Sequence, residues 1–379
     1  MKKISALILV GILIVTTGCN LLGGDSKKIK SEMRDITTME VTREMGVGIN
    51  LGNTFEAVAG FSSDDPSEYE VSWGSPIITK ELIEGYADEG FGVLRIPVAW
   101  SNMMEDDYTI GAAYMKRVKE VVEWTLQSGM YAILNIHWDG GWWEKFPTKT
   151  EECMYRYERF WTQISDEFKD YNDYLMFESL NEEAGWEEIW NRYSGEGDKA
   201  ASYDLVNEIN QKFVDIVRAS GGKNGERHLL IAGYNTDFVL TSDEMFKMPQ
   251  DEINRCAVSV HYYTPPTFCI LEKDASWGKA RTDWGSERDF DELNMYFDMV
   301  EERFIDNGVP VIIGEYGVST TNKTDEVIRL YMASVTEAAY SRQMCPVVWD
   351  ITDVFYDRTT FKMKDQELLA QIMAVKEKE

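Results

Sequence analysis

Short apolar runs rich in β-branched and aromatic residues alternate with longer stretches in which apolar residues recur every three to four positions. Eight of the short runs predict strands, at 46–51, 92–98, 131–137, 174–180, 228–232, 257–263, 309–314 and 346–349. The longer stretches predict helices at 79–89, 112–128, 151–170, 202–219, 289–303 and 323–340. Thr37 and Glu40 form a capping box that predicts a further short helix at 38–45. The pattern is therefore that of an α/β protein with a parallel sheet.

The number of strands favours a closed barrel. Eight strands that alternate with helices predict a (β/α)8 TIM barrel, and an open doubly wound sheet is the alternative. The sequence shows no Pro-rich or Ser-rich linker and no internal repeat after residue 37, so we expect one domain over residues 37–379. In such a barrel the catalytic residues stand where strands end and the following loops begin.

The start of the chain is typical of an exported protein. Lys2 and Lys3 precede an apolar run at 4–15, which ends in Thr16-Thr17-Gly18-Cys19. Residues 1–18 are therefore predicted to be a lipoprotein-type signal peptide, and Cys19 to be the acylated N-terminus. An ordinary secretion signal is the alternative. The polar residues 19–36 are predicted to form a flexible tether at the cell surface or outer membrane, and the lipid anchor is the one expected contact with a membrane.

Composition excludes several classes of function. The 379 residues include 66 acidic and 38 basic side chains, a formal charge of −28, which repels the phosphates of nucleic acids. Three histidines argue against a multi-histidine metal centre, and we expect neither a metal nor an organic cofactor. We expect a monomer. The four cysteines after Cys19 are widely spaced and are predicted to be buried free thiols: Cys153, Cys256, Cys269 and Cys345.

Two carboxylates close apolar strands. Asn181 and Glu182 follow the predicted strand 174–180, and Glu315 follows 309–314. Most of the 66 acidic residues belong to the solvated surface, but a carboxylate at the end of an apolar strand is costly to desolvate. Cleavage of a glycosidic bond needs two such groups, one to protonate the leaving oxygen and one to face the oxocarbenium-like carbon.

Other residues fall in the same predicted layer. Arg95 lies inside the second strand, where it requires an anion, either in a structural ion pair or as a clamp on a catalytic carboxylate. His137 and His261 lie at predicted strand ends, whereas His228 begins a strand at the opposite rim and is predicted to be structural. Trp349 ends the last strand. Further tryptophans follow strands and predict a polysaccharide cleft, although about half should be packing residues: Trp100, Trp138, Trp142, Trp143, Trp186, Trp277 and Trp284.

The order and spacing of these motifs resemble glycoside hydrolase family 5, the cellulase family of retaining (β/α)8 barrels. The branch that acts on β-1,4-glucans, xyloglucan and mixed-linkage glucans is the most similar. The matching motifs are Gly48-Ile49-Asn50-Leu51-Gly52-Asn53-Thr54, Leu94-Arg95-Ile96-Pro97, Asn135-Ile136-His137, Asn181-Glu182, His261-Tyr262-Tyr263, Gly314-Glu315-Tyr316-Gly317 and Trp349.

The resemblance assigns roles to these residues. It implies that Glu182 is the general acid and then the general base, and that Glu315 is the nucleophile. Arg95 and Tyr263 would hold Glu315 ionised, and Asn181 would hydrogen-bond the sugar 2-hydroxyl. The remaining matched or neighbouring residues would shape the subsite at the cleaved bond: Asn53, His137, Trp138, His261 and Trp349.

Three departures from the family pattern affect the choice of substrate. Glu183 stands where Pro is common, Trp138 where a second His is common, and Ile351 where relatives often carry Asn. The resemblance implies an endo-acting β-1,4-glucanase for cellulose-type, mixed-linkage or xyloglucan chains. The same mechanism on mannan, glucomannan or xylan is one alternative. A surface glycan-binding lipoprotein without turnover is another, although it would need neither Glu182 nor Glu315.

Overall fold

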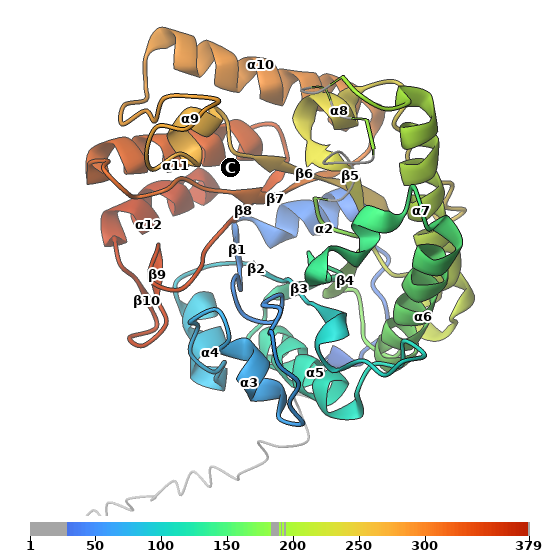
Figure 1. Cartoon of the computed structure of the whole chain (residues 1–379). Helices are drawn as coiled ribbons and strands as arrows, with labels where there is room; N and C mark the ends of the chain where they lie inside the picture. The colour runs from blue at the N-terminus through green and yellow to red at the C-terminus, as the bar shows by residue number, and fades with distance from the viewer. Residues whose placement is uncertain (1–28, 183–188, 191, 193–194, 378–379) are drawn as a thin grey trace, which may run out of the picture.

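Eight parallel strands form a closed barrel in a computed structural model that describes residues 29–182, 189–190, 192 and 195–377 (Figure 1). The strands follow one another in sequence order, and β8 pairs with β1 to close the ring. They are β1 Gly48–Asn50, β2 Val93–Ile96, β3 Tyr131–Asn135, β4 Leu175–Glu178, β5 Leu229–Asp237, β6 Cys256–Tyr262, β7 Val311–Tyr316 and β8 Cys345–Val348. The prediction of a TIM barrel is confirmed, and the alternative prediction of an open doubly wound sheet is wrong.

The predicted helices lie outside the barrel, and each is present with its ends shifted by at most a few residues (Figure 1). Thr37 caps α2 through the predicted capping box with Glu40. These helices are α2 Thr38–Met45, α4 Lys80–Asp88, α5 Ala112–Gln127, α6 Thr150–Phe168, α7 Lys199–Ala219, α10 Glu287–Arg303 and α11 Asp325–Tyr340.

Several short elements were not predicted. They lie in the loops and after β8, where a few residues of helix or strand depend on contacts that a local pattern does not contain. They are α3 Pro66–Glu70, α8 Phe238–Ser242, α9 Pro266–Cys269, α12 Gln366–Met373 and the hairpin of β9 Tyr356–Asp357 with β10 Lys362–Met363, together with short 3₁₀ helices at Trp100–Met103, Asp139–Lys145, Gly222–Gly225, Ile305–Asn307 and Ala374–Glu377.

The alternation of side chains along the strands places a polar layer above an apolar one inside the barrel. Val93 and Met176 belong to the cluster of buried apolar side chains at the amino-terminal end of the barrel. Two residues further along the same strands stand Arg95 and Glu178, both completely buried. Because residues i and i+2 share a face of a strand, this step carries polar groups into the interior just below the mouth. The same layer includes Asn50, Asn135 and Ser259, which are also completely buried.

The domain begins earlier than predicted. Ile29 is buried in the core, and Arg34 Nε donates to Asp173 Oδ2 over 2.6 Å. Lys223 Nζ donates to the carbonyl oxygens of Lys30 and Ser31, each at 2.6 Å. The polar sequence of residues 29–36 predicts a tether, but their polar groups bind the amino-terminal side of the barrel. That part of the boundary prediction is corrected; residues 1–28, including Cys19, lie outside the described residues.

The prediction of buried free thiols is confirmed for three of the four cysteines and is wrong about the burial of Cys256, and the structural position predicted for His228 is confirmed. The four described cysteines are free thiols, and Cys153, Cys269 and Cys345 are buried while Cys256 is half-buried. His228 lies just before β5 at the amino-terminal side, where Thr38 Oγ1 is 2.9 Å from its Nδ1. Burial lowers the pKa of His228 to about 3, so the ring is neutral.

Within the described ranges no helix is both long and apolar enough to cross a bilayer.

Candidate active site

The two predicted carboxylates meet at the barrel mouth. Glu315 lies in β7, and Glu182 lies four residues beyond the end of β4. One carboxylate oxygen of each, together with a ring nitrogen of His261, lie within 4.8 Å of one another. Retaining glycosidases hold their carboxyl groups about 5–5.5 Å apart, and inverting ones about 6.5–9.5 Å apart. The arrangement therefore fits a retaining mechanism.

His261 bridges the two carboxylates from β6. Its Nδ1 is 2.8 Å from Glu182 Oε1 and 3.6 Å from Glu315 Oε2. The His261 side chain is almost fully buried, whereas 37% of the Glu182 side chain is exposed. Glu182 is thus open to water and substrate on one side while its other side is held by the ring.

Arg95 satisfies both of the roles considered for it. Its Nη1 donates to Glu315 Oε1 over 2.8 Å, its Nη2 donates to Asn181 Oδ1 over 2.8 Å, and its Nε donates to Glu178 Oε2 over 2.7 Å. Burial lowers the pKa of Arg95, but the charges of Glu178 and Glu315 more than compensate and raise it above its ordinary value. The guanidinium is therefore a permanent cation that joins a structural ion pair to the candidate nucleophile.

Both residues expected beside Glu315 contact it, in a buried environment. Tyr263 donates its hydroxyl to Glu315 Oε2 over 3.0 Å, so both expected partners, Arg95 and Tyr263, contact this carboxylate. Burial nevertheless raises the pKa of Glu315 above its ordinary value, and His261, Arg95 and the Tyr263 hydrogen bond offset only part of that rise. The two partners limit the effect of burial on Glu315 and do not reverse it.

His137 and Trp349 form one wall of the site. Their rings are parallel within 4°, with centroids 5.8 Å apart. Burial lowers the pKa of His137 well below its ordinary value and Arg95 lowers it further, so the ring is neutral. The Nδ2 of Asn181 lies 3.3 Å from His137 Nε2, which accepts its hydrogen. Asn181 is thereby fixed from both sides, by Arg95 at its oxygen and His137 at its nitrogen.

The loops that carry Asn53 and Trp349 are joined by Arg358, a residue that the sequence analysis missed. Asn53 has a left-handed backbone (φ 57°), and its carbonyl accepts a 2.6 Å hydrogen bond from Ser75 Oγ. Arg358, in the β9–β10 hairpin, donates from Nη2 to the carbonyl oxygens of Gly52 (2.8 Å) and Asp350 (3.3 Å). One buried side chain thus fixes the loop after β1 to the loop after β8.

The tryptophans divide into platform and packing residues. Trp138 is 41% exposed, and its indole lies 6.2 Å from that of Trp73, which is equally exposed. Trp73 was not singled out from the sequence. Trp277 is 58% exposed on the loop after α9. Trp186 and the departure at Glu183 lie outside the described residues. The other predicted loop tryptophans are buried packing residues: Trp100, Trp142, Trp143 and Trp284.

Glu178 was also missed, although the sequence contains a signal for it. It follows Met176 by two residues in an apolar strand, so an inward direction could have been inferred from the alternation. Its carboxylate accepts from Asn135 Nδ2 (3.0 Å) and Ser259 Oγ (2.8 Å) as well as from Arg95. It is therefore the structural ion-pair partner that Arg95 required.

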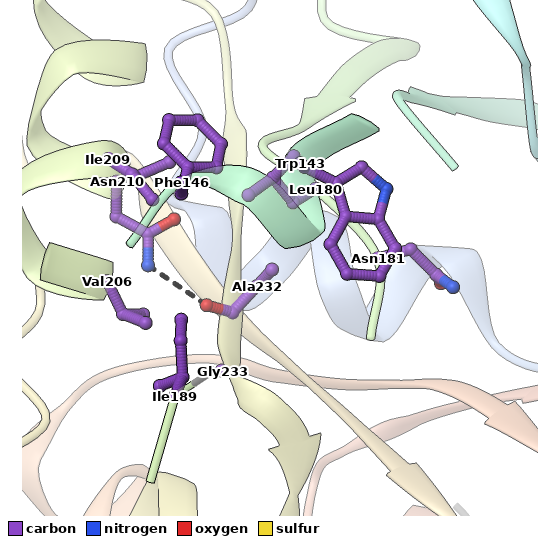
Figure 2. A pocket seen from close by; sticks show the side chains of 10 residues that line it. All are labelled: Trp143, Phe146, Leu180, Asn181, Ile189, Val206, Ile209, Asn210, Ala232 and Gly233. Atoms are coloured by element: carbon purple, nitrogen blue, oxygen red, sulfur yellow. Dashed lines mark hydrogen bonds between the residues drawn. The ribbon is translucent and has the colours of Figure 1, made fainter. Parts of the chain in front are cut away.

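An apolar pocket lies beside Asn181 (Figure 2). Across it Asn210 Nδ2 donates to the carbonyl of Ala232 over 3.0 Å. Neither Glu182 nor Glu315 lines this pocket, so it is separate from the carboxylate pair. Its walls are Trp143, Phe146, Leu180, Asn181, Ile189, Val206, Ile209, Asn210, Ala232 and Gly233.

Comparison with known proteins gives one consistent result. Residues 52–354 match the family described as cellulase (glycosyl hydrolase family 5). A xyloglucan-specific endo-β-1,4-glucanase of Bacteroides ovatus is 37% identical over 365 residues, covering 90% of this chain and 70% of its own. Endoglucanase A of Ruminococcus albus is 34% identical over 322 residues, covering 84% of each chain.

Solved structures agree with these relatives. A broad-specificity endoglucanase from Clostridium longisporum superposes with a TM-score of 0.82 at 30% identity, over 92% of this chain and 99% of its own. A Bacteroides ovatus xyloglucanase in complex with a XXXG heptasaccharide gives 0.80 at 34% identity, over 91% and 78%. The chain therefore belongs to glycoside hydrolase family 5, the cellulase family, and is a glycoside hydrolase.

Proposed function

We propose that this protein is an endo-acting, retaining β-1,4-glucanase that acts as a monomer on plant cell-wall β-glucans of the cellulose, mixed-linkage or xyloglucan type. The observation that carries the proposal is the proximity of Glu182 and Glu315, within 4.8 Å together with His261, at the mouth of the barrel. Relatives named as endoglucanases and as a xyloglucan-specific glucanase support the choice of substrate.

The contacts of each carboxylate support the roles that the family resemblance implies. Glu315 attacks the anomeric carbon and forms a glycosyl ester, while Glu182 gives its proton to the departing glycosidic oxygen. Glu182 then removes a proton from water, which attacks the ester and releases Glu315 as a carboxylate. The partial exposure of Glu182 gives that water access. Asn181, which contacts Arg95 and His137, is the residue that we expect to hydrogen-bond the sugar 2-hydroxyl.

A panel of soluble polysaccharides tests the substrate class. Barley β-glucan, xyloglucan, carboxymethyl cellulose, glucomannan and xylan are compared by reducing-end release, with product sizes recorded. We expect the highest rates on the glucans, with early products of many lengths because cleavage is internal. Activity confined to xylan or mannan would overturn the substrate class. Binding without any release of reducing ends would favour the non-catalytic alternative.

Trp138 and Trp73 offer an exposed aromatic surface beside His137, so we expect them to bind a glucan chain away from the cleaved bond. Stacking is worth about 1 kcal/mol, so Trp138→Ala and Trp73→Ala should each raise KM for barley β-glucan about fivefold. The rate on a short aryl cellobioside should stay unchanged. Tyr155→Ala, an exposed aromatic on α6, is the control. Equal losses on long and short substrates would contradict the assignment.

We also propose that the protein is exported and anchored through an acylated Cys19. The order of charged, apolar and small residues before Cys19 supports this. Residues 29–36 bind the amino-terminal side of the barrel, so an anchor that precedes them would leave the mouth facing away from the membrane. In cells fed a clickable fatty acid, the wild-type protein should become labelled and the Cys19→Ser variant should not. An unlabelled wild type in the medium would indicate ordinary secretion.

A further inference from the structure

Glu178 is a completely buried carboxylate that does not line the cleft and yet touches the catalytic machinery through Arg95. Each of its oxygens is engaged. Oε2 accepts from Arg95 Nε and Asn135 Nδ2, and Oε1 accepts from Ser259 Oγ, with distances of 2.7, 3.0 and 2.8 Å. The carboxylate is thus held in place by three donors, one of them the Arg95 cation.

The contacts of Arg95 show what this pairing does to the guanidinium. Glu178 takes the Nε edge, and this leaves Nη1 for Glu315 and Asn50 and Nη2 for Asn181. The planar fork can satisfy these acceptors only in one orientation. Without an anion at Nε, the guanidinium could rotate and lose its alignment with Glu315. Glu178 therefore fixes the direction from which the Arg95 guanidinium contacts Glu315, the candidate nucleophile.

The same pairing divides the charge of Arg95 between two anions. Arg95 is 2.7 Å from a Glu178 oxygen and 2.8 Å from a Glu315 oxygen, with all three side chains buried. A carboxylate that had the guanidinium to itself would be a more stable anion, hence a poorer nucleophile. The titratable groups that face this cluster come from β2, β3, β4, β6 and β7 and the loops that follow them: Arg95, His137, Glu178, Glu182, His261, Tyr263 and Glu315.

We propose that Glu178 is a positioning residue of the hydrolytic reaction, which orients Arg95 and offsets part of its charge so that Glu315 stays reactive. The inference rests on the proposed role of Glu315 as the nucleophile. Glu178 acts through Arg95 and has no contact with substrate in this scheme.

Glu178→Gln tests the charge without changing the shape. The amide oxygen can accept from Arg95 and Asn135 while the amide nitrogen donates to Ser259 Oγ, so each hydrogen bond has a counterpart. With the anion removed, Arg95 stabilises the charge of Glu315 alone. The pH dependence of kcat/KM on barley β-glucan reports the ionisation of groups in the free enzyme. Its acidic limb should move to lower pH by about one unit. KM at the optimum should change less than about twofold.

Asp251→Asn is the matched control, because Asp251 pairs with Arg218 at 2.9 Å on the amino-terminal side of the barrel, far from the mouth. Its acidic limb should coincide with that of the wild type. An acidic limb of Glu178→Gln that does not move, or that moves to higher pH, would overturn the proposed role of Glu178. The proposed function would still stand, because the wild type would still hydrolyse the glucan. Loss of hydrolysis by the wild type itself would instead reject the proposed function.

Glu178→Asp tests the positioning separately, and it also serves if the Gln variant does not fold. It keeps the charge but withdraws it by one methylene, so the acidic limb should stay within about 0.3 pH units of the wild type while kcat falls about tenfold. Wild-type kcat in this variant would contradict an orienting role for Glu178.

Discussion

Replacing Glu315 by alanine should lower kcat on barley β-glucan by about six orders of magnitude, as expected when a nucleophile that forms a covalent intermediate is removed. Glu315 is the carboxylate that Arg95 and Tyr263 both contact, and no other carboxylate within the described mouth of the barrel has this pair of donors. Initial rates of reducing-end release, measured at high enzyme concentration, check the loss.

The matched control is Glu326→Ala, which removes an exposed glutamate in the first turn of α11, the helix that follows β7. This variant should retain wild-type kcat, and both variants should show the wild-type circular dichroism spectrum. A folded Glu315→Ala protein that keeps more than about 1% of the wild-type rate would show that another residue is the nucleophile.

Replacing Glu182 by glutamine should have an effect that depends on the leaving group. The neutral amide keeps the shape but cannot donate a proton to the departing sugar, so hydrolysis of β-glucan should fall by about 10³–10⁴-fold. A dinitrophenyl cellobioside needs no proton for departure, so its first step should stay fast. Without the general base the second step is slow, and the ester should accumulate.

The measurement is a burst of dinitrophenolate, equal in amount to the enzyme, followed by a slow steady state. The wild type under the same conditions should reach a much faster steady state, because its second step is assisted by Glu182. Equal losses on β-glucan and on the activated substrate, without a burst, would contradict the assignment of Glu182 as the acid and base.

The barrel and the centre of the site could be predicted from the sequence for a physical reason. A strand buried on both faces leaves an apolar run, and β7 therefore pointed directly to Glu315 at its end. The requirement of buried Arg95 for an anion was also visible, since burial without a partner is costly. The structure adds that the anions are two, Glu178 and Glu315.

The rim and the domain boundary could not be predicted, because long-range contacts determine them. Arg358 reaches Gly52 across about three hundred residues of chain, and nothing local in the β9–β10 hairpin indicates that contact. Trp73 becomes part of a surface only when the fold brings it to Trp138. Arg34 lies in a polar segment whose sequence is typical of a solvated tether, and its pairing with Asp173 depends on the fold.

The most direct test of the central claim, that Glu315 is the nucleophile of a double displacement, is mass spectrometry of the protein after treatment with dinitrophenyl 2-deoxy-2-fluoro-β-cellobioside. The fluorine slows hydrolysis of the ester, because the 2-hydroxyl contact that strengthens at the transition state is absent. We predict a mass increase of one fluorocellobiosyl group, located by peptide mapping on Glu315. An adduct on Glu182, or turnover of the probe with no covalent adduct at any residue, would contradict the account.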